Sequence, residues 1–186
     1  MPTDHSLLIK NGILLDPLNG YTQTVQDIGI NDGRIVSIAN EIFEETAATV
    51  IDASGVIITP GLIDLHVHVW DGVAHLGIPA DPNCVGKGVT TAFDAGSAGA
   101  DTYPGFQKYV IDVSATRIKS FLHISSQGQL AQNIGELTDL RYADVGRAIQ
   151  TCETFKDSIV GIKIRMSDGI VGENGKEGLK RALEVC

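Results

Sequence analysis

Two histidines separated by one residue are the side chains in this sequence best suited to binding a metal ion. They are His66 and His68, in the apolar segment "GLIDLHVHVW" at residues 61–70. Side chains two residues apart on a β-strand point to the same side, so both imidazoles can reach one cation, and imidazole suits zinc and its first-row neighbours. By the same period Asp64 shares that side, where its carboxylate would orient a ligand histidine. The alternative is that these are hydrogen-bonded structural residues.

A lysine in a later apolar segment is the second chemically informative residue. Lys163 lies between Ile162 and Ile164 in "IVGIKIRMS" at residues 159–167. Burial disfavours the charged ammonium group, and a neutral amine can take up carbon dioxide to become an anionic carbamate ligand. The alternatives are an ion pair with Asp94 or a side chain that extends to the rim of the site. The spacing alone does not decide among these.

Other residues near the ends of predicted strands are candidates for contacts with a substrate. The arginine among them can grip a substrate carboxylate or pair with a carboxylate of the protein. The histidine and the neighbouring serine either touch substrate or make structural hydrogen bonds. The backbone of the glycine–serine pair can approach a ligand, although glycine there also suits a turn. Asp94, like Asp64, is a candidate for a carboxylate that supports a metal ligand from behind. The candidates for substrate contact are Arg165, His123, Ser125, Gly96 and Ser97.

The segments that carry these residues alternate between strand and helix patterns. This alternation predicts an α/β fold with a parallel sheet or barrel, in which polar side chains gather at the C-terminal ends of the strands. Asp81-Pro82 predicts a helix start and Gly88 its end. The long polar connection at 126–143 predicts a functional or disordered loop. The predicted strands are 62–69, 90–95, 117–125 and 159–167, and the predicted helices are 104–115, 144–156 and 176–186.

The first sixty residues contain short strand patterns separated by turns. "VQDIGI", Asn31-Asp32-Gly33 and "RIVSI" predict a β-hairpin, and Asn11-Gly12 predicts a turn between two more strands. His5 and Asp52 are expected at the surface and in a turn, without a functional role. We therefore expect a small β-strand domain over residues 1–60 and an α/β domain over residues 61–186.

Composition and charge limit the class of partner. The 186 residues carry a formal net charge of −9 and no basic cluster, which argues against nucleic acid and anionic membrane surfaces as partners. No apolar run approaches the length of a membrane span, and "MPTDHSLLIK" lacks the pattern of a signal peptide. Cys84, Cys152 and Cys186 are odd in number and widely spaced, which favours free thiols in a reducing cytosol. A cytoplasmic protein with a small-molecule substrate is expected, and a homo-oligomer is compatible with the sequence.

The motif "IDASGVIITPGLIDLHVHV" resembles the opening signature of the amidohydrolase superfamily, and "GVTTAFDAGSAG" and "GIKIR" resemble its dihydroorotase-related amidohydrolase/deacetylase group. The resemblance implies a (β/α)8 TIM barrel, preceded by the small β-strand domain, with His66 and His68 as ligands of the more buried metal. It also implies that Lys163 is carboxylated and bridges two divalent metal ions, usually zinc. The implied reaction is hydrolysis of an amide, cyclic amide or acyl ester of a small molecule by a metal-bridging hydroxide.

The sequence also departs from the pattern of that group. Only about four βα units follow Gly61, so the barrel is expected to stop after its fourth unit. The histidines of the second metal and the aspartate that serves as general base would lie beyond residue 186, so no catalytic base is assigned in this chain. The alternative reading is a noncatalytic truncated or scaffold relative that acts as a structural or interaction protein.

Overall fold

The computed structural model describes residues 4–186, and residues 1–3 of the expected first domain lie outside the described residues. The chain divides into two compact units, Met1–Pro60 and Gly61–Cys186. In the first unit the strands form a sheet in the order β3-β2-β1-β4, and β5 pairs with β1. Its elements are β1 (Leu7–Asp16), η1 (Pro17–Asn19), β2 (Tyr21–Asn31), β3 (Arg34–Ala39), η2 (Glu44–Thr46), β4 (Val50–Asp52) and β5 (Ile57–Ile58).

The predicted hairpin in this unit is confirmed, and the predicted turn at Asn11-Gly12 is wrong. Strands β2 and β3 pair antiparallel, and Asp32 and Gly33 take the positive φ angles of 48° and 70° that a tight hairpin turn needs. At Asn11, by contrast, β1 continues through a bulge. The backbone N–H of Asn11, at φ 61°, donates to Asp27 Oδ1 over 2.8 Å, which satisfies a group that the bulge takes out of the ladder.

Two polar residues of the first unit are buried and partnered. Asp27 lies 3.1 Å from the Lys10 ammonium. Burial raises the pKa of Asp27, but backbone N–H groups of Asn11 and Ile42 and the Lys10 charge outweigh it, so its pKa lies below the ordinary value. His5, expected at the surface, is buried, with its ring nitrogens 3.0 Å from Ser37 Oγ and 3.2 Å from Thr46 Oγ1. Its polar atoms are satisfied inside this unit.

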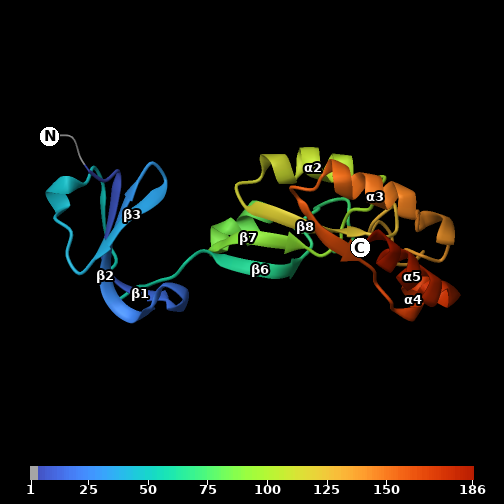
Figure 1. Ribbon diagram of the computed structural model, residues 1–186, viewed down its shortest axis with the longest axis horizontal. Coiled ribbons are helices and arrows are strands. Elements are labelled where there is room, and N and C mark those ends of the chain that lie inside the picture. The colour runs from blue at the N-terminus through green and yellow to red at the C-terminus, as the bar shows by residue number, and fades with distance from the viewer. Residues whose placement is uncertain (1–3) are drawn as a thin grey trace. The chain divides into compact units, whose positions relative to one another are not determined.

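The second unit has an α/β fold built on a parallel sheet, as the alternation of patterns predicted. The sheet has the order β6-β7-β8-β9, and Figure 1 shows α2 and α3 on one side of it. Its strands are β6 (Leu62–Val67), β7 (Val89–Asp94), β8 (Arg117–His123) and β9 (Ile159–Lys163). Its helices are α1 (Ala80–Asn83), η3 (Val85–Lys87), α2 (Tyr103–Tyr109), η4 (Ile111–Val113), η5 (Leu140–Tyr142), α3 (Val145–Thr154), α4 (Asp168–Val171), η6 (Gly172–Asn174) and α5 (Gly175–Val185).

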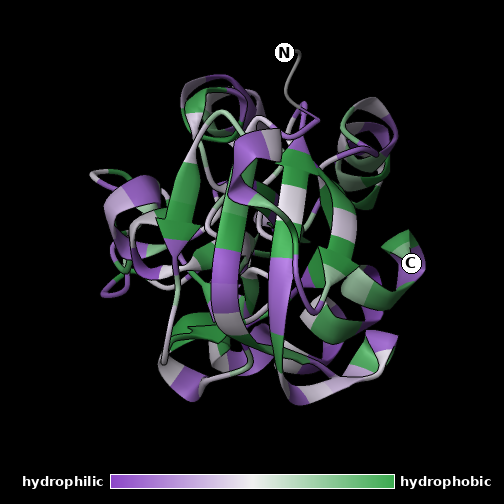
Figure 2. Cartoon of the chain, turned by 90° about the vertical axis from the view of Figure 1, so that its left-hand side faces the viewer, coloured by the Kyte–Doolittle hydropathy of each residue, from purple (hydrophilic) through white to green (hydrophobic). Residues whose placement is uncertain are grey.

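The core of this unit lies between the sheet and the helices. Tyr103 and Phe106 of α2 and Leu122 of β8 are fully buried there, and the Tyr103 hydroxyl lies 2.6 Å from Ser120 Oγ. The helix that leads to the C-terminus carries both hydrophobic and hydrophilic residues in Figure 2. Its small residue Ala182 belongs to the core cluster. The side of this helix that carries Ala182 therefore packs toward the core, as is usual for an amphipathic helix.

The ends of several elements differ from the sequence prediction. The helix predicted to start at Asp81-Pro82 is only the short α1, and the Asp81 carboxylate accepts the backbone N–H groups of Ala115 and Thr116 instead of capping a helix. Gly88, at φ 86°, ends η3 as predicted. Across residues 4–186 the structure contains no helix with the length and apolar character needed to cross a bilayer.

Candidate metal and substrate site

A bulge in β6 separates Asp64 from the two histidines. Asp64 pairs with Ala92 and Val67 pairs with Asp94, so three steps along β6 face two steps along β7. Register partners in a parallel sheet share a face, so the extra residue moves His66 to the face opposite Asp64. The prediction that Asp64 shares the histidine face is therefore wrong. Its carboxylate instead accepts the backbone N–H of His66 over 2.9 Å.

Asp94 also lies on the side of the sheet that the helices cover. It is the register partner of Ser120, whose hydroxyl contacts Tyr103 of α2. The role that the sequence suggested for Asp94, a carboxylate that supports a metal ligand from behind, stays a prediction. Its carboxylate accepts the backbone N–H of Val69 at 2.9 Å, of Gly96 at 3.0 Å and of Ser97 at 2.6 Å, and the Ser97 hydroxyl at 2.7 Å. Asp94 thus holds the loop after β7 against the end of β6.

The hydrogen bonds around Ser97 set the tautomer of His68. Because Ser97 Oγ donates to Asp94, it is left to accept from His68 Nδ1, which lies 3.0 Å away. This network assigns the ring proton to Nδ1 and leaves the lone pair on Nε2. Burial lowers the pKa of His68, the Asp94 charge opposes this, and the nearby His66 and Lys163 add to the lowering. His68 therefore presents a neutral imidazole nitrogen.

The second histidine of the pair lies beside the first. His66 is exposed, and its ring centroid lies 5.7 Å from that of His68, with the two rings nearly perpendicular at 82°. Val67, between them, packs toward the core, so both histidines lie on the opposite face of β6. The pair is thus available on the face away from the helices.

Lys163 ends β9 and approaches the loop after β7. A Cβ atom at Gly96 would lie 2.6 Å from both Cβ and Cγ of Lys163, so only glycine fits there, and its φ of 89° also favours glycine. Gly96 is thus explained by close packing against the lysine. Among residues 4–186 the amine of Lys163 forms no ion pair, so the pair with Asp94 that the sequence left open does not form. Lys163 is left as an uncommitted, half-buried amine.

A second cluster joins the buried His123 and Glu136 with the half-buried Arg165, which sequence analysis did not connect. Glu136 Oε2 lies 2.8 Å from His123 Nε2, and Glu136 Oε1 lies 2.6 Å from Arg165 Nη2. His123 Nδ1 accepts the backbone N–H of Ser125 over 2.9 Å, so its Nε2 carries the proton that faces the carboxylate. Burial raises the pKa of Glu136, but His123 and Arg165 outweigh it, so that pKa lies below its ordinary value. His123 and Arg165 are thus both engaged by Glu136, which is the structural alternative that the sequence left open for each.

Glu136 was missed because it lies in the polar connection at 126–143, which has no periodicity. The segment is folded onto the α/β unit: the backbone N–H groups of Glu136 and Leu137 each donate to Ile170 O over 3.0 Å, and Leu137 is fully buried. The signal in the sequence was the presence of two basic residues near strand ends, His123 and Arg165, for which no particular acidic partner was identified. The long connection is therefore an ordered part of the site.

The arrangement provides part of a metal-binding donor set. Within residues 4–186 no group of three or more His, Cys, Asp or Glu side chains is placed to hold a metal ion. The available donors are the two imidazoles of His66 and His68 and the amine of Lys163. Hydrogen bonding of the second ring nitrogen to an oriented acceptor, as in His68 with Ser97 and Asp94, is what metal-ligating histidines need. The residues present therefore fit a zinc-type cation.

Comparison with known proteins finds relatives that are named deacetylases and dihydroorotases. No family model matches the chain. It is 38% identical over 169 residues to a deacetylase of Agrobacterium fabrum, covering 90% of this chain and 42% of that protein. It is 55% identical over 62 residues to a dihydroorotase of Streptococcus pneumoniae, covering 33% of this chain and 14% of that protein.

Two solved structures resemble the fold of this chain over almost its whole length. The crystal structure of a dihydroorotase matches with a TM-score of 0.86 and 34% identity, covering 96% of this chain and 47% of that one. The structure of an adenine deaminase matches with a TM-score of 0.82 and 33% identity, covering 98% and 47%. The chain thus spans less than half the length of the deacetylase and of both crystallised proteins. The names of these proteins are those of enzymes, which does not favour a noncatalytic reading.

Proposed function

The chain is a homologue of the deacetylases and dihydroorotases of the amidohydrolase superfamily, and we propose that it carries the first metal-binding portion of a metal-dependent hydrolase. The substrate is a small molecule with an amide, cyclic amide or acyl ester bond. The observation that carries the proposal is the Asp94–Ser97–His68 chain of hydrogen bonds, which presents Nε2 of a neutral imidazole.

The chain's own residues divide the work as follows. His66 and His68 would bind one divalent cation, zinc being the best match to imidazole donors. The uncommitted Lys163 amine would attack the carbon of carbon dioxide and lose a proton, giving a carbamate whose two oxygens can be shared between two cations. When bound, the cations would lower the pKa of a water molecule and polarise the acyl carbon. Asp94 and Ser97 hold the His68 ring in place.

We further propose that the four-stranded sheet is the first half of a (β/α)8 barrel. The support is the strand β6, on which Leu62, Ile63 and Leu65 are between 54% and 69% exposed. Apolar strand residues of this kind would be covered in a closed barrel, whose remaining strands would also supply the second metal's histidines and the general-base aspartate.

Zinc binding to the 186-residue chain tests the metal proposal. In bicarbonate buffer, with a chromophoric chelator as competitor, we expect about one zinc ion per chain, and His68→Ala should lower the affinity at least about tenfold. His75→Ala is the matched control, because His75 is exposed and its ring nitrogen Nδ1 lies 3.1 Å from the Gln129 carbonyl oxygen, away from the two candidate ligands in sequence. Equal zinc affinity of the wild-type and His68→Ala chains would overturn the proposal.

The proposed carbamate on Lys163 can be tested separately from zinc binding. With isotopically labelled bicarbonate and zinc, NMR should detect a carbamate carbon in the wild-type chain, and Lys163→Ala should remove it. Lys119→Ala is the control, since Lys119 is a second lysine of the same sheet whose amine donates to the Asp157 carbonyl. A carbamate signal that survives in Lys163→Ala would assign the modification elsewhere.

A further inference from the structure

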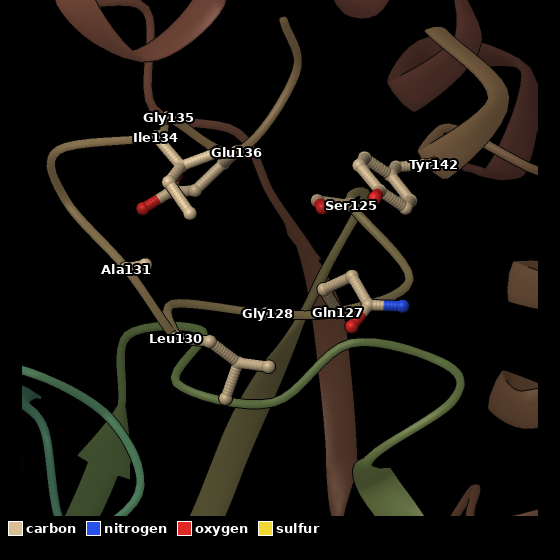
Figure 3. A pocket seen from close by; sticks show the side chains of 9 residues that line it. All are labelled: Ser125, Gln127, Gly128, Leu130, Ala131, Ile134, Gly135, Glu136 and Tyr142. Carbon is tan, nitrogen blue, oxygen red and sulfur yellow. The ribbon is translucent and has the colours of Figure 1, made fainter. Parts of the chain in front are cut away.

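A hollow in the connection between β8 and α3 is lined by residues that the metal proposal does not use. It has a volume of about 150 Å³. Leu130, Ser125, Ile134 and Tyr142 surround it in Figure 3. A cavity of about this size in a protein interior accepts a benzene-sized molecule. The space therefore suits a compact group.

One wall of the hollow carries a buried polar group without a partner. Ser125 is fully buried, lines the hollow, and its hydroxyl has no hydrogen-bond partner among residues 4–186. A buried hydroxyl left unpaired is unfavourable, so a ligand atom that bonds to it gains that interaction. The other walls are largely apolar, from Leu130, Ala131 and Ile134.

The charge near the hollow is already balanced. Glu136 lines it, but both carboxylate oxygens face the His123 and Arg165 nitrogens at 2.8 and 2.6 Å. A charged ligand group would need a countercharge of its own to offset the loss of hydration. No such countercharge is free on the lining residues, so the hollow favours an uncharged group.

The position of the hollow connects it with the candidate metal residues. Ser125 lies two residues after His123, which is the register partner of Lys163 in β9. The segment that contains Ser125 also packs on the loop after β7, where Gln129 N donates to the Ser97 carbonyl over 2.9 Å. A substrate held at His68 and Lys163 could thus extend a substituent toward Ser125.

We infer that this hollow binds a compact, uncharged, mainly apolar substituent with one hydrogen-bonding atom, which bonds to Ser125 Oγ. That the bound group is part of a substrate rests on the proposed hydrolase function. The enzyme would then prefer substrates with a phenol-sized neutral group over substrates that place a carboxylate there. Ser125 and the apolar wall are the residues that determine this specificity.

Binding of phenol to the 186-residue chain, followed by NMR titration, tests the inference without catalysis or metal. We expect phenol to bind at least about tenfold more tightly than benzoate, and Ser125→Ala to weaken phenol about fivefold, the effect of one hydrogen bond. Ala131→Leu, which fills the hollow, should weaken phenol more than tenfold. Ser167→Ala and Ala115→Leu are matched controls at exposed positions.

Two results would overturn the inference: phenol affinity that is unchanged in Ala131→Leu, or benzoate that binds as tightly as phenol. Ile134→Ala is a second test in case the other variants misfold, because Ile134 is 66% exposed and its truncation should leave the fold intact. It should weaken phenol binding about threefold, because it removes part of the apolar wall. Zinc binding by the same chains separates the two proposals. If the chain binds phenol selectively but binds no zinc, the inference about the hollow stands and the metal proposal is contradicted. If it binds zinc but does not bind phenol selectively, only the inference about the hollow is contradicted.

Discussion

Two polar clusters lie at the carboxyl end of the same parallel sheet, and they use similar residue types in opposite ways. In one, His68 and Lys163 keep a ring nitrogen and an amine uncommitted. In the other, His123 and Arg165 are both engaged by the buried Glu136. Residue type and strand position alone therefore do not separate a ligand from a structural residue. The partners that each side chain already has make the distinction.

Removal of Glu136 should have the largest effect, because it leaves the fully buried His123 and the half-buried Arg165 without their acidic partner. Glu136→Ala is expected to lower the free energy of unfolding of the α/β unit by about 3–5 kcal/mol. Urea denaturation followed by fluorescence of Trp70, the single tryptophan in the chain, reports on this unit. Glu184→Ala, at an exposed pair with Lys180, is the control. A loss below about 1 kcal/mol would mean that the second cluster is not structural.

Asp94 connects the sheet to the first cluster and should give the next largest effect. Asp94→Asn replaces one carboxylate oxygen by an N–H donor, which opposes the donors of Val69 and Ser97. We expect a loss of about 2 kcal/mol in unfolding free energy, measured in the same assay. Asp112→Asn, at an exposed contact with Gln107, should leave stability unchanged. Equal stability of the two variants would contradict the role of Asp94 as an anchor.

The acid sensitivity of the α/β unit should come in part from Glu136. Its pKa in the folded chain lies below the ordinary value of 4.5, so its contribution to stability is present above that pH and is lost as the pH falls. The free energy of unfolding should therefore decrease between about pH 5 and pH 3, and less steeply in Glu136→Gln. If the free energy of unfolding changes with pH in the same way in the wild-type and Glu136→Gln chains, other carboxylates cause the loss of stability in acid.

Removal of a residue of the first cluster should have the smallest effect on stability. His66 is exposed, and its ring contacts only His68 among the aromatic pairs of the described chain. His66→Ala should change the unfolding free energy by less than about 0.5 kcal/mol while it weakens zinc binding. His123→Ala is the comparison, because it removes a fully buried ring from the other cluster and should be clearly destabilising. Similar losses in the two variants would remove the distinction between the clusters.

Much of the fold followed from local patterns in the sequence. The strand and helix segments after Gly61 were found by periodicity, and the hairpin at Asp32-Gly33 by its turn residues. The turn predicted at Asn11-Gly12 was wrong because the left-handed conformation that asparagine tolerates also forms a β-bulge. Local conformation is encoded in neighbouring residues, whereas the choice between a turn and a bulge depends on the strands that pair with the segment.

The candidate site shows the same division. His66, His68 and Lys163 were identified from residue type and parity, and their role as metal ligands stays a prediction. The face of Asp64 was predicted wrongly, because one extra residue in β6 reverses the alternation of side chains. Ser97, treated as a backbone contact, instead orients the His68 ring through its hydroxyl.

The sequence by itself determined the α/β class, the hairpin and the presence of two histidines and a lysine suited to a metal, because these depend on residues close together in the chain. Only the tertiary structure decided which of these side chains are already engaged. Glu136 meets His123 and Arg165 across 13 and 29 positions of sequence, as their residue numbers show. Such pairing depends on sheet register and on how a nonperiodic segment folds back, and neither is encoded locally.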